Sequence, residues 1–305
     1  FAVRTIKVES VKSTMKRCHL LSLQFQTMSD AIYLCVFTFT LMLVQAKYNK
    51  KYCEVQGDDP SSQCYTKETL VTMTHNPHQI AVDNETNTLY FSFDSGQGEY
   101  IPALYKIATK QLTVLKGVRD AFAIAYDSKE KEMYFGGTHG IYRFNTNAKS
   151  LKRLNINNLD IWWLFVKKQI YFIKFPSLNT YSYQNGSIKT FPELSDNVIH
   201  QMVEDIDNNK FFTNNSGLYG MKSNQQKATL IKESSRFINV AVDHDGYVYV
   251  CSDDGIYIVS RMIQKVKKLV NLQGVLGFTF DKDNYIIYSD SHEIIRLLPV
   301  HNNLI

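Results

Sequence analysis

The chain has 305 residues, and its 34 basic and 29 acidic residues give a formal net charge of +5. Five of those basic residues and two of the acidic ones precede residue 47, so the remainder carries a net charge of only +2. No basic stripe remains there of the kind that binds nucleic acid. We therefore expect no nucleic-acid partner.

Residues 31–44 form an uncharged apolar run that is followed by Gln45, Ala46 and a polar stretch. The run is too short to cross a bilayer as a helix, which needs about 20 residues. It fits the hydrophobic region of a signal peptide, with Val44-Gln45-Ala46 as a small-residue cleavage site. We expect translation to start at Met15 or Met28 and residues 1–46 to be absent from the mature protein. The mature protein would then be secreted and have no membrane anchor.

Three cysteines follow the predicted cleavage site. Cys53 and Cys64 are expected to pair in an oxidising compartment, within a lead-in segment of residues 47–66. Cys251 stands in a predicted strand and is expected to be a buried free thiol. Three potential glycosylation sites fall in predicted turns, which agrees with secretion: Asn84, Asn185 and Asn214.

One pattern recurs six times from residue 67 onward. An apolar strand ends in Asp, a short polar turn follows, and a second apolar strand is centred on an aromatic residue. Successive aromatic anchors are 37 to 44 residues apart: Tyr90, Tyr134, Tyr171, Phe212, Tyr249 and Tyr288. A repeat of about 40 residues made of short strands is typical of a β-propeller blade. The sequence therefore predicts an all-β fold in which residues 67–305 form a single six-bladed propeller.

The Asp at the end of the first strand is missing only from the third repeat, which has Trp162 and Trp163 instead. Such an Asp bonds the N–H groups of its own turn, so we interpret it as architectural and not as a metal ligand. Adjacent residues on a strand point in opposite directions, so one tryptophan should face the channel and one the next blade. The last repeat lacks an outermost strand, and residues 68–73 could supply it and close the ring.

Propellers usually bind small molecules at the mouth of the central channel, the end where each innermost strand begins. At this end of the channel the pattern places aromatic and cationic side chains. Lys174 is expected nearby, and Asp160 is the one carboxylate expected at a strand start. Such a surface suits a planar, partly anionic small molecule. The candidate ligand-binding residues are His78, Phe122, His139, Trp162, His200, Arg236, Phe237 and His292.

Two other kinds of site were weighed for the same residues. The four candidate histidines could bind a soft metal ion, but histidines spread over four repeats more often form hydrogen bonds or stack. A calcium site of the gluconolactonase type needs several oxygen ligands, which the strand starts do not supply. We therefore expect no metal and no cofactor.

Common enzyme motifs are absent: the chain has no G-x-S-x-G, H-E-x-x-H or Walker sequence. We expect no catalytic residues, and a monomeric protein that binds a small aromatic metabolite and is not an enzyme. A secreted lactonase or esterase of the gluconolactonase-like propeller type is the alternative. A protein-binding propeller is a third possibility.

The stretch from His75 to Ser92 resembles the first repeat of the insect, lepidopteran, ommochrome-binding proteins. The likeness covers residues 47–305 and includes the early cysteine pair and the Gly-Ile-Tyr segments that begin at Gly140 and Gly255. Members of that family are secreted haemolymph proteins that carry tryptophan-derived phenoxazinone pigments. The resemblance therefore implies a pigment carrier in haemolymph. It assigns no ligand-binding residue.

Overall fold

The computed structural model describes residues 53–300, apart from 60, 157–158, 192–193, 195–197, 235 and 261–264. The predicted non-mature segment, residues 1–46, lies outside the described residues. Every named element in the described part is a β-strand. No helix there is long and apolar enough to cross a membrane.

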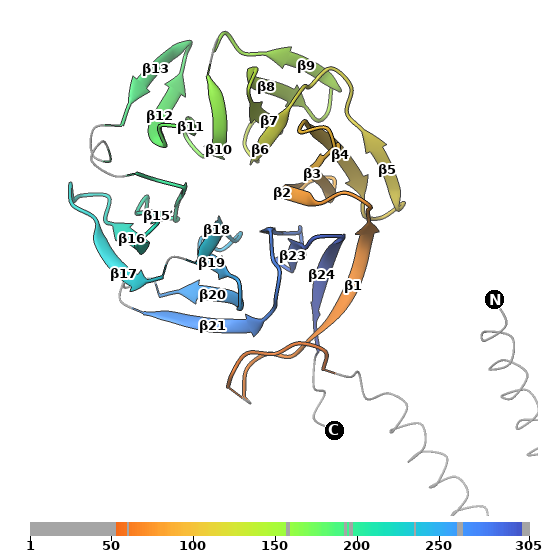
Figure 1. Ribbon diagram of the computed structural model, residues 1–305, viewed down its shortest axis with the longest axis vertical. Helices are drawn as coiled ribbons and strands as arrows, with labels where there is room; N and C mark the ends of the chain where they lie inside the picture. The colour runs from red at the N-terminus through yellow and green to blue at the C-terminus, as the bar shows by residue number, and fades with distance from the viewer. Residues whose placement is uncertain are drawn as a thin grey trace, which may run out of the picture. The chain divides into compact units, whose positions relative to one another are not determined.

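Six sheets of four antiparallel strands form a six-bladed propeller, as predicted, and stand in a ring (Figure 1). The first blade contains β2 (Pro77–Asp83), β3 (Thr88–Asp94), β4 (Tyr100–Lys106) and β5 (Gln111–Val114). The second contains β6 (Ala121–Asp127), β7 (Glu132–Gly137), β8 (Gly140–Asn145) and β9 (Ser150–Arg153). The third contains β10 (Asp160–Val166), β11 (Ile170–Phe175), β12 (Asn179–Gln184) and β13 (Ser187–Thr190).

The remaining three blades follow in chain order. The fourth contains β14 (Gln201–Glu204), β15 (Lys210–Asn214), β16 (Gly217–Met221) and β17 (Thr229–Glu233). The fifth contains β18 (Phe237–Val242), β19 (Val248–Ser252), β20 (Gly255–Val259) and β21 (Val266–Asn271). The sixth contains β22 (Gly277–Phe280), β23 (Ile286–Ser289), β24 (Glu293–Pro299) and the N-terminal β1 (Tyr65–Thr72).

Strand β1 closes the ring, and this confirms the predicted role of residues 68–73. It pairs antiparallel with β24 along its whole length, so the two ends of the propeller share one sheet. Arg296 on β24 binds Glu68 of β1 at 2.6 Å and Asp281 at 3.2 Å. The Asp281 side chain is fully buried, so this ion pair connects the closing strand to the interior of the sixth blade.

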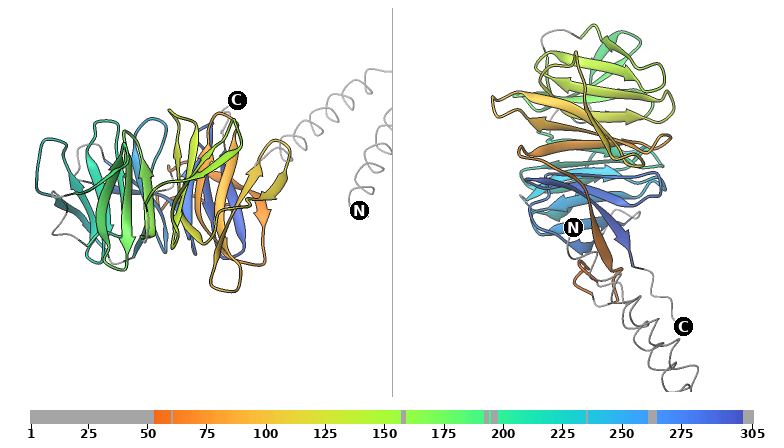
Figure 2. Two further views of the ribbon diagram at one scale, coloured as in Figure 1. Left: turned by 90° about the horizontal axis from the view of Figure 1, so that it is seen from above. Right: turned by 90° about the vertical axis from the view of Figure 1, so that its right-hand side faces the viewer.

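The hydrophobic core consists of layers between neighbouring blades. Neighbouring sheets pack face to face around the ring (Figure 1 and Figure 2). The described residues form six buried clusters, and each cluster draws side chains from two adjacent blades. Phe91 of the first blade, for example, packs with Ile287 and Ile294 of the sixth. Alternation along each strand supplies both faces of a blade with apolar side chains.

The recurrent Asp has the architectural role predicted for it. In each of the five repeats that carry it, the carboxylate accepts the N–H group of the residue two positions on, at 2.9 to 3.1 Å. The five residues are Asp83, Asp127, Asp205, Asp243 and Asp281. These bonds fix the turn between the first and second strand of a blade.

The disulfide between Cys53 and Cys64 is present, and Cys251 is free and buried, as predicted. The three potential glycosylation sites differ in exposure. Asn185 is exposed in the turn between β12 and β13, whereas Asn84 and Asn214 are half-buried. The Asn214 side chain accepts N–H groups of its own turn.

Candidate ligand site at the channel mouth

Five rings from the first three blades form a continuous cluster at the end where the innermost strands begin. His78 contacts Tyr100 at a centroid distance of 5.2 Å, and Tyr100 contacts Phe122 at 4.9 Å. Phe122 stacks on Trp162 at 4.9 Å with an interplanar angle of 22°. Trp162 lies 6.0 Å from Phe175. We call these five residues the mouth cluster. The structure thus brings together three predicted site residues, His78, Phe122 and Trp162.

Three of these rings stand directly after a buried residue of the innermost strand: Pro77, Ala121 and Ile161. At each of these positions a β-bulge turns the side chain out of the ladder. His78, Phe122 and Trp162 are accordingly half-buried. Trp163 is buried and donates its indole N–H to Met202 O of the fourth blade at 3.0 Å. This confirms the predicted division between the two tryptophans.

Exposed apolar side chains extend this surface. Phe175, at the end of β11, is 47% exposed, and Ile238, at the start of β18, is 40% exposed. Val198, two residues before His200, is 51% exposed. Apolar side chains gathered on one face of a protein commonly mark a binding surface.

Carboxylates flank the mouth cluster more densely than the sequence suggested. Asp120 accepts the Tyr100 N–H at 3.1 Å and the Thr138 hydroxyl at 2.6 Å. Burial, together with the charge of Asp120, raises the pKa of Asp160. Burial, helped by Asp94 and Asp120, also raises the pKa of Tyr100. The expectation that Asp160 is the one carboxylate here was therefore incomplete, because Asp120 lies just before its strand and was not counted.

Burial also governs the histidines of the innermost strands. It lowers the pKa of His78, an effect that the charge of Asp94 partly offsets. Burial likewise lowers the pKa of His200, which directly precedes β14. The other two candidate histidines, His139 and His292, are exposed in hairpin turns. No group of three or more metal-ligating side chains occurs among the described residues.

Two candidates of the fifth blade are placed differently from the prediction. Phe237 is only 6% exposed and packs between the fourth and fifth blades, so Ile238 and not Phe237 is exposed at this strand start. Arg236 forms an exposed ion pair with Asp253 at 3.2 Å. Lys174 is half-buried on β11. The prediction was one position out of phase on β18. His78 and Phe122 stand five residues before the Asp of their repeats, as Ile238 does, whereas Phe237 stands six residues before Asp243.

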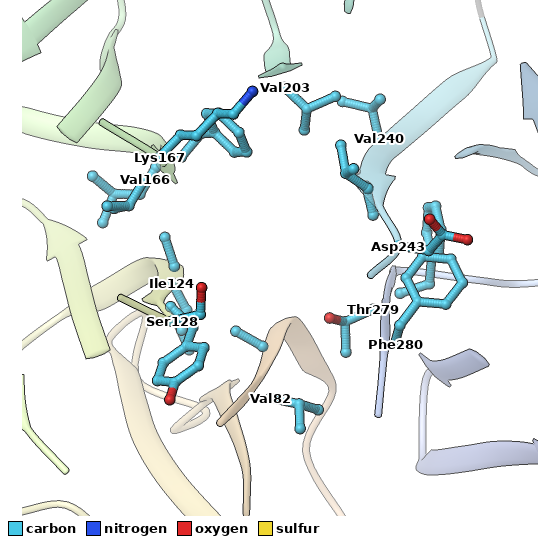
Figure 3. A pocket seen from close by; sticks show the side chains of 18 of the residues that line it. Val82, Ile124, Ser128, Val166, Lys167, Val203, Val240, Asp243, Thr279 and Phe280 are labelled. Atoms are coloured by element: carbon cyan, nitrogen blue, oxygen red, sulfur yellow. The ribbon is translucent and has the colours of Figure 1, made fainter. Parts of the chain in front are cut away.

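A separate cavity of about 440 Å³ occupies the channel nearer the Asp turns. Figure 3 shows lining side chains around an open centre, with Val82, Val166, Val240, Lys167 and Phe280 among them. None of the eight candidate residues lines it. The cavity wall mixes aliphatic side chains with aromatic and charged ones, Trp163, Phe165 and Lys167 among them.

Sequence reasoning missed Tyr100 and Phe175, and chose Phe237 in place of Ile238, which stands at the strand start. Tyr100 begins β4 and Phe175 ends β11, so both belong to the hairpins between second and third strands. That hairpin position was recognised as part of the mouth, but the alternation of a single strand does not show which hairpin side chain reaches the channel. Aromatic identity at those positions was the available signal.

The chain is similar in sequence to the ommochrome-binding protein of Manduca sexta. The two are 29% identical over 244 residues, which cover 77% of this chain and 88% of the relative. No family model matches the chain.

Solved propellers share the fold at low identity. A gluconolactonase from Xanthomonas campestris matches with a TM-score of 0.65 and 12% identity, covering 81% of this chain and 96% of that chain. A luciferin-regenerating enzyme matches with a TM-score of 0.60 and 11% identity, covering 76% and 95%. Both are enzymes, which corrects the expectation that this chain is not an enzyme: the missing motifs do not exclude catalysis in this fold. That expectation rested only on the absence of common enzyme motifs, and this fold occurs in enzymes.

Proposed function

We propose that this protein is an extracellular carrier that binds an ommochrome pigment at the mouth cluster. The observation that carries the proposal is the stack of Trp162 on Phe122, bordered by the exposed ring of Phe175. A planar conjugated ligand gains about 1 kcal/mol from stacking on such a ring. It gains about 25 cal/mol more for each Å² of apolar surface that it buries.

The sequence relative supports the choice of ligand class, because its name records ommochrome binding. The disulfide supports an extracellular location, since such bonds persist in oxidising compartments. Haemolymph is the extracellular fluid that the family resemblance implies.

The charges around the cluster refine the expected ligand. Asp120 and Asp160 favour a ligand that presents hydrogen-bond donors or a protonated amine beside its aromatic plane. The sequence-based expectation of a partly anionic ligand depended on Arg236 and Lys174. Arg236 is already paired with Asp253, so any carboxylate of the ligand would have to compete for it.

Tryptophan fluorescence tests the proposal, with the phenoxazinone xanthommatin as the probe. Binding at the mouth should quench emission saturably, because Trp162 belongs to the cluster. Free N-acetyltryptophanamide, titrated in parallel, corrects for light absorbed by the coloured ligand. Absence of saturable quenching at high micromolar xanthommatin, with EDTA-sensitive turnover of a lactone, would replace the carrier by a hydrolase.

A further inference from the structure

The side chains at the mouth are carried by β-bulges. In four blades the register between the first and second strand shifts just where the mouth-facing residue stands. The residues at these shifts include His78, Phe122, Trp162 and Ile238. A bulge leaves its extra residue outside the ladder and redirects its side chain, and bulges are frequent beside functional sites.

Three of the bulge carbonyls are held by a side chain of the preceding blade. Ser289 donates its hydroxyl to His78 O at 3.0 Å, and Ser92 donates to Phe122 O at 3.0 Å. Gln201 donates its amide N–H to Ile238 O at 2.6 Å. All three donors are buried, with at most 5% exposure. They are therefore too deep to touch a ligand.

The contact between Gly277 and His78 shows how closely this arrangement is packed. A Cβ on Gly277 would lie 2.5 Å from His78 O, so only glycine allows the carbonyl to approach Ser289 there. Trp162 is the exception among the four bulges. The position that would hold its carbonyl is Gly136, where a Cβ would meet Ile161 at 2.7 Å. Packing of Ile161 replaces the hydrogen bond in that blade.

The fourth blade provides an internal comparison. The N–H of His200 donates to Thr213 O at 2.9 Å, as the N–H of Leu276 donates to Ser289 O at 2.8 Å, so Thr213 and Ser289 are equivalent. Yet the Thr213 hydroxyl is buried and has no hydrogen-bond partner among the described residues. The Ile238 carbonyl of the next blade is bound by Gln201 instead. Thr213 thus has a hydroxyl in the same place without the same role.

We propose that Ser92, Ser289 and Gln201 are positioning residues of the mouth site, which fix the bulge peptides and thereby aim Phe122, His78 and Ile238 at the ligand. This inference rests on the proposed function for its effect on affinity. One part of the proposal, the orientation of Phe122 against Trp162, can be tested on the protein without ligand. A fixed bulge peptide reduces the conformational freedom that binding would otherwise have to remove.

The test compares two variants that each lose a buried hydroxyl. Ser92→Ala loses one that binds a carbonyl, and Thr213→Val loses one that binds none within the described residues. Ser92→Thr keeps a hydroxyl donor at this position. The first readout is iodide quenching of tryptophan in the unliganded protein, which reaches half-buried Trp162 more readily than Trp163, at 8% exposure. The second is the Kd for xanthommatin by equilibrium dialysis. The third is the melting temperature.

We expect Ser92→Ala to change iodide quenching and to raise Kd about fivefold, the effect of losing about 1 kcal/mol. Thr213→Val should leave both readouts unchanged, and Ser92→Thr should restore both. Unchanged quenching and Kd in Ser92→Ala, or equal effects in Thr213→Val, would overturn the proposal. If Ser92→Ala does not fold, Ser92→Cys, which places a weaker donor there, is read in the same way. If the wild type does not bind xanthommatin, the proposed function fails, and iodide quenching alone still decides whether Ser92 positions the cluster.

Discussion

Trp162 of the third blade stacks on Phe122 of the second, with ring centroids 4.9 Å apart. Both rings are half-buried, so the contact joins two blades at the surface of the mouth. The stack of Phe212 on Tyr219, by contrast, lies within the fourth blade, and Phe212 is fully buried. A half-buried aromatic stack between blades leaves ring surface on which a planar ligand can stack.

Replacing Trp162 by Ala should weaken xanthommatin binding at least about tenfold, because the ligand loses a stacking partner and buried apolar area. Equilibrium dialysis measures this without the lost fluorophore. Ile188→Ala is the matched control, since Ile188 is 41% exposed on the outer strand β13, away from the mouth. Equal affinity of the Trp162→Ala protein and the wild type would contradict the assignment.

His78 should make stability depend on pH. Burial lowers its pKa below the ordinary value of 6.5, so the unfolded state binds more protons just below that pH. The stabilising effect of neutral His78 is complete above pH 6.5 and is lost as the pH falls through the folded-state pKa. We expect the free energy of unfolding in urea to decrease from pH 7.5 to 5.5, and less steeply in His78→Gln. His139→Gln, which alters an exposed histidine, should retain the wild-type slope; a wild-type slope in His78→Gln would argue against this role.

Two arginines allow a matched test of ring closure. Arg296 and Arg236 each bind an aspartate at 3.2 Å, but the Asp281 side chain is fully buried and that of Asp253 is 52% exposed. Arg296→Met should cost at least about 2 kcal/mol in urea unfolding, because it leaves Asp281 buried without its cation. Arg236→Met should change stability by no more than about 0.5 kcal/mol. Similar losses in the two variants would show that the buried pair does not stabilise the closure.

The cysteines should differ sharply in reactivity. Burial raises the pKa of the Cys251 thiol to about 12, so iodoacetamide at pH 8 should label it only after unfolding. Peptides from unreduced protein should contain the Cys53–Cys64 cross-link. Mass spectrometry reads both, and a cross-link that contains Cys251 would refute the assignment.

The sequence was sufficient to predict the architecture, because the repeat and its Asp turns are local patterns that recur. The closing strand could also be recognised, because residues 68–73 stand directly before the first repeat. The sequence was also sufficient to bring His78 and Phe122 to the mouth, since each stands five residues before the Asp of its repeat. Trp162 was placed there from the alternation of the two tryptophans in the repeat that lacks the Asp.

The prediction failed for Phe237, because that residue stands six positions before Asp243, whereas the mouth position stands five before the Asp and is occupied by Ile238. It also missed Ser92, whose partner is a backbone carbonyl of another blade. Such contacts depend on how neighbouring sheets pack.

The most direct measurement is a crystal structure of the mature protein with xanthommatin. The mouth site predicts the ligand plane against Trp162, within stacking distance of the mouth cluster and near Asp120 and Asp160. Ligand density in the channel cavity beside Val82 and Val240, with the mouth cluster unoccupied, would contradict the account.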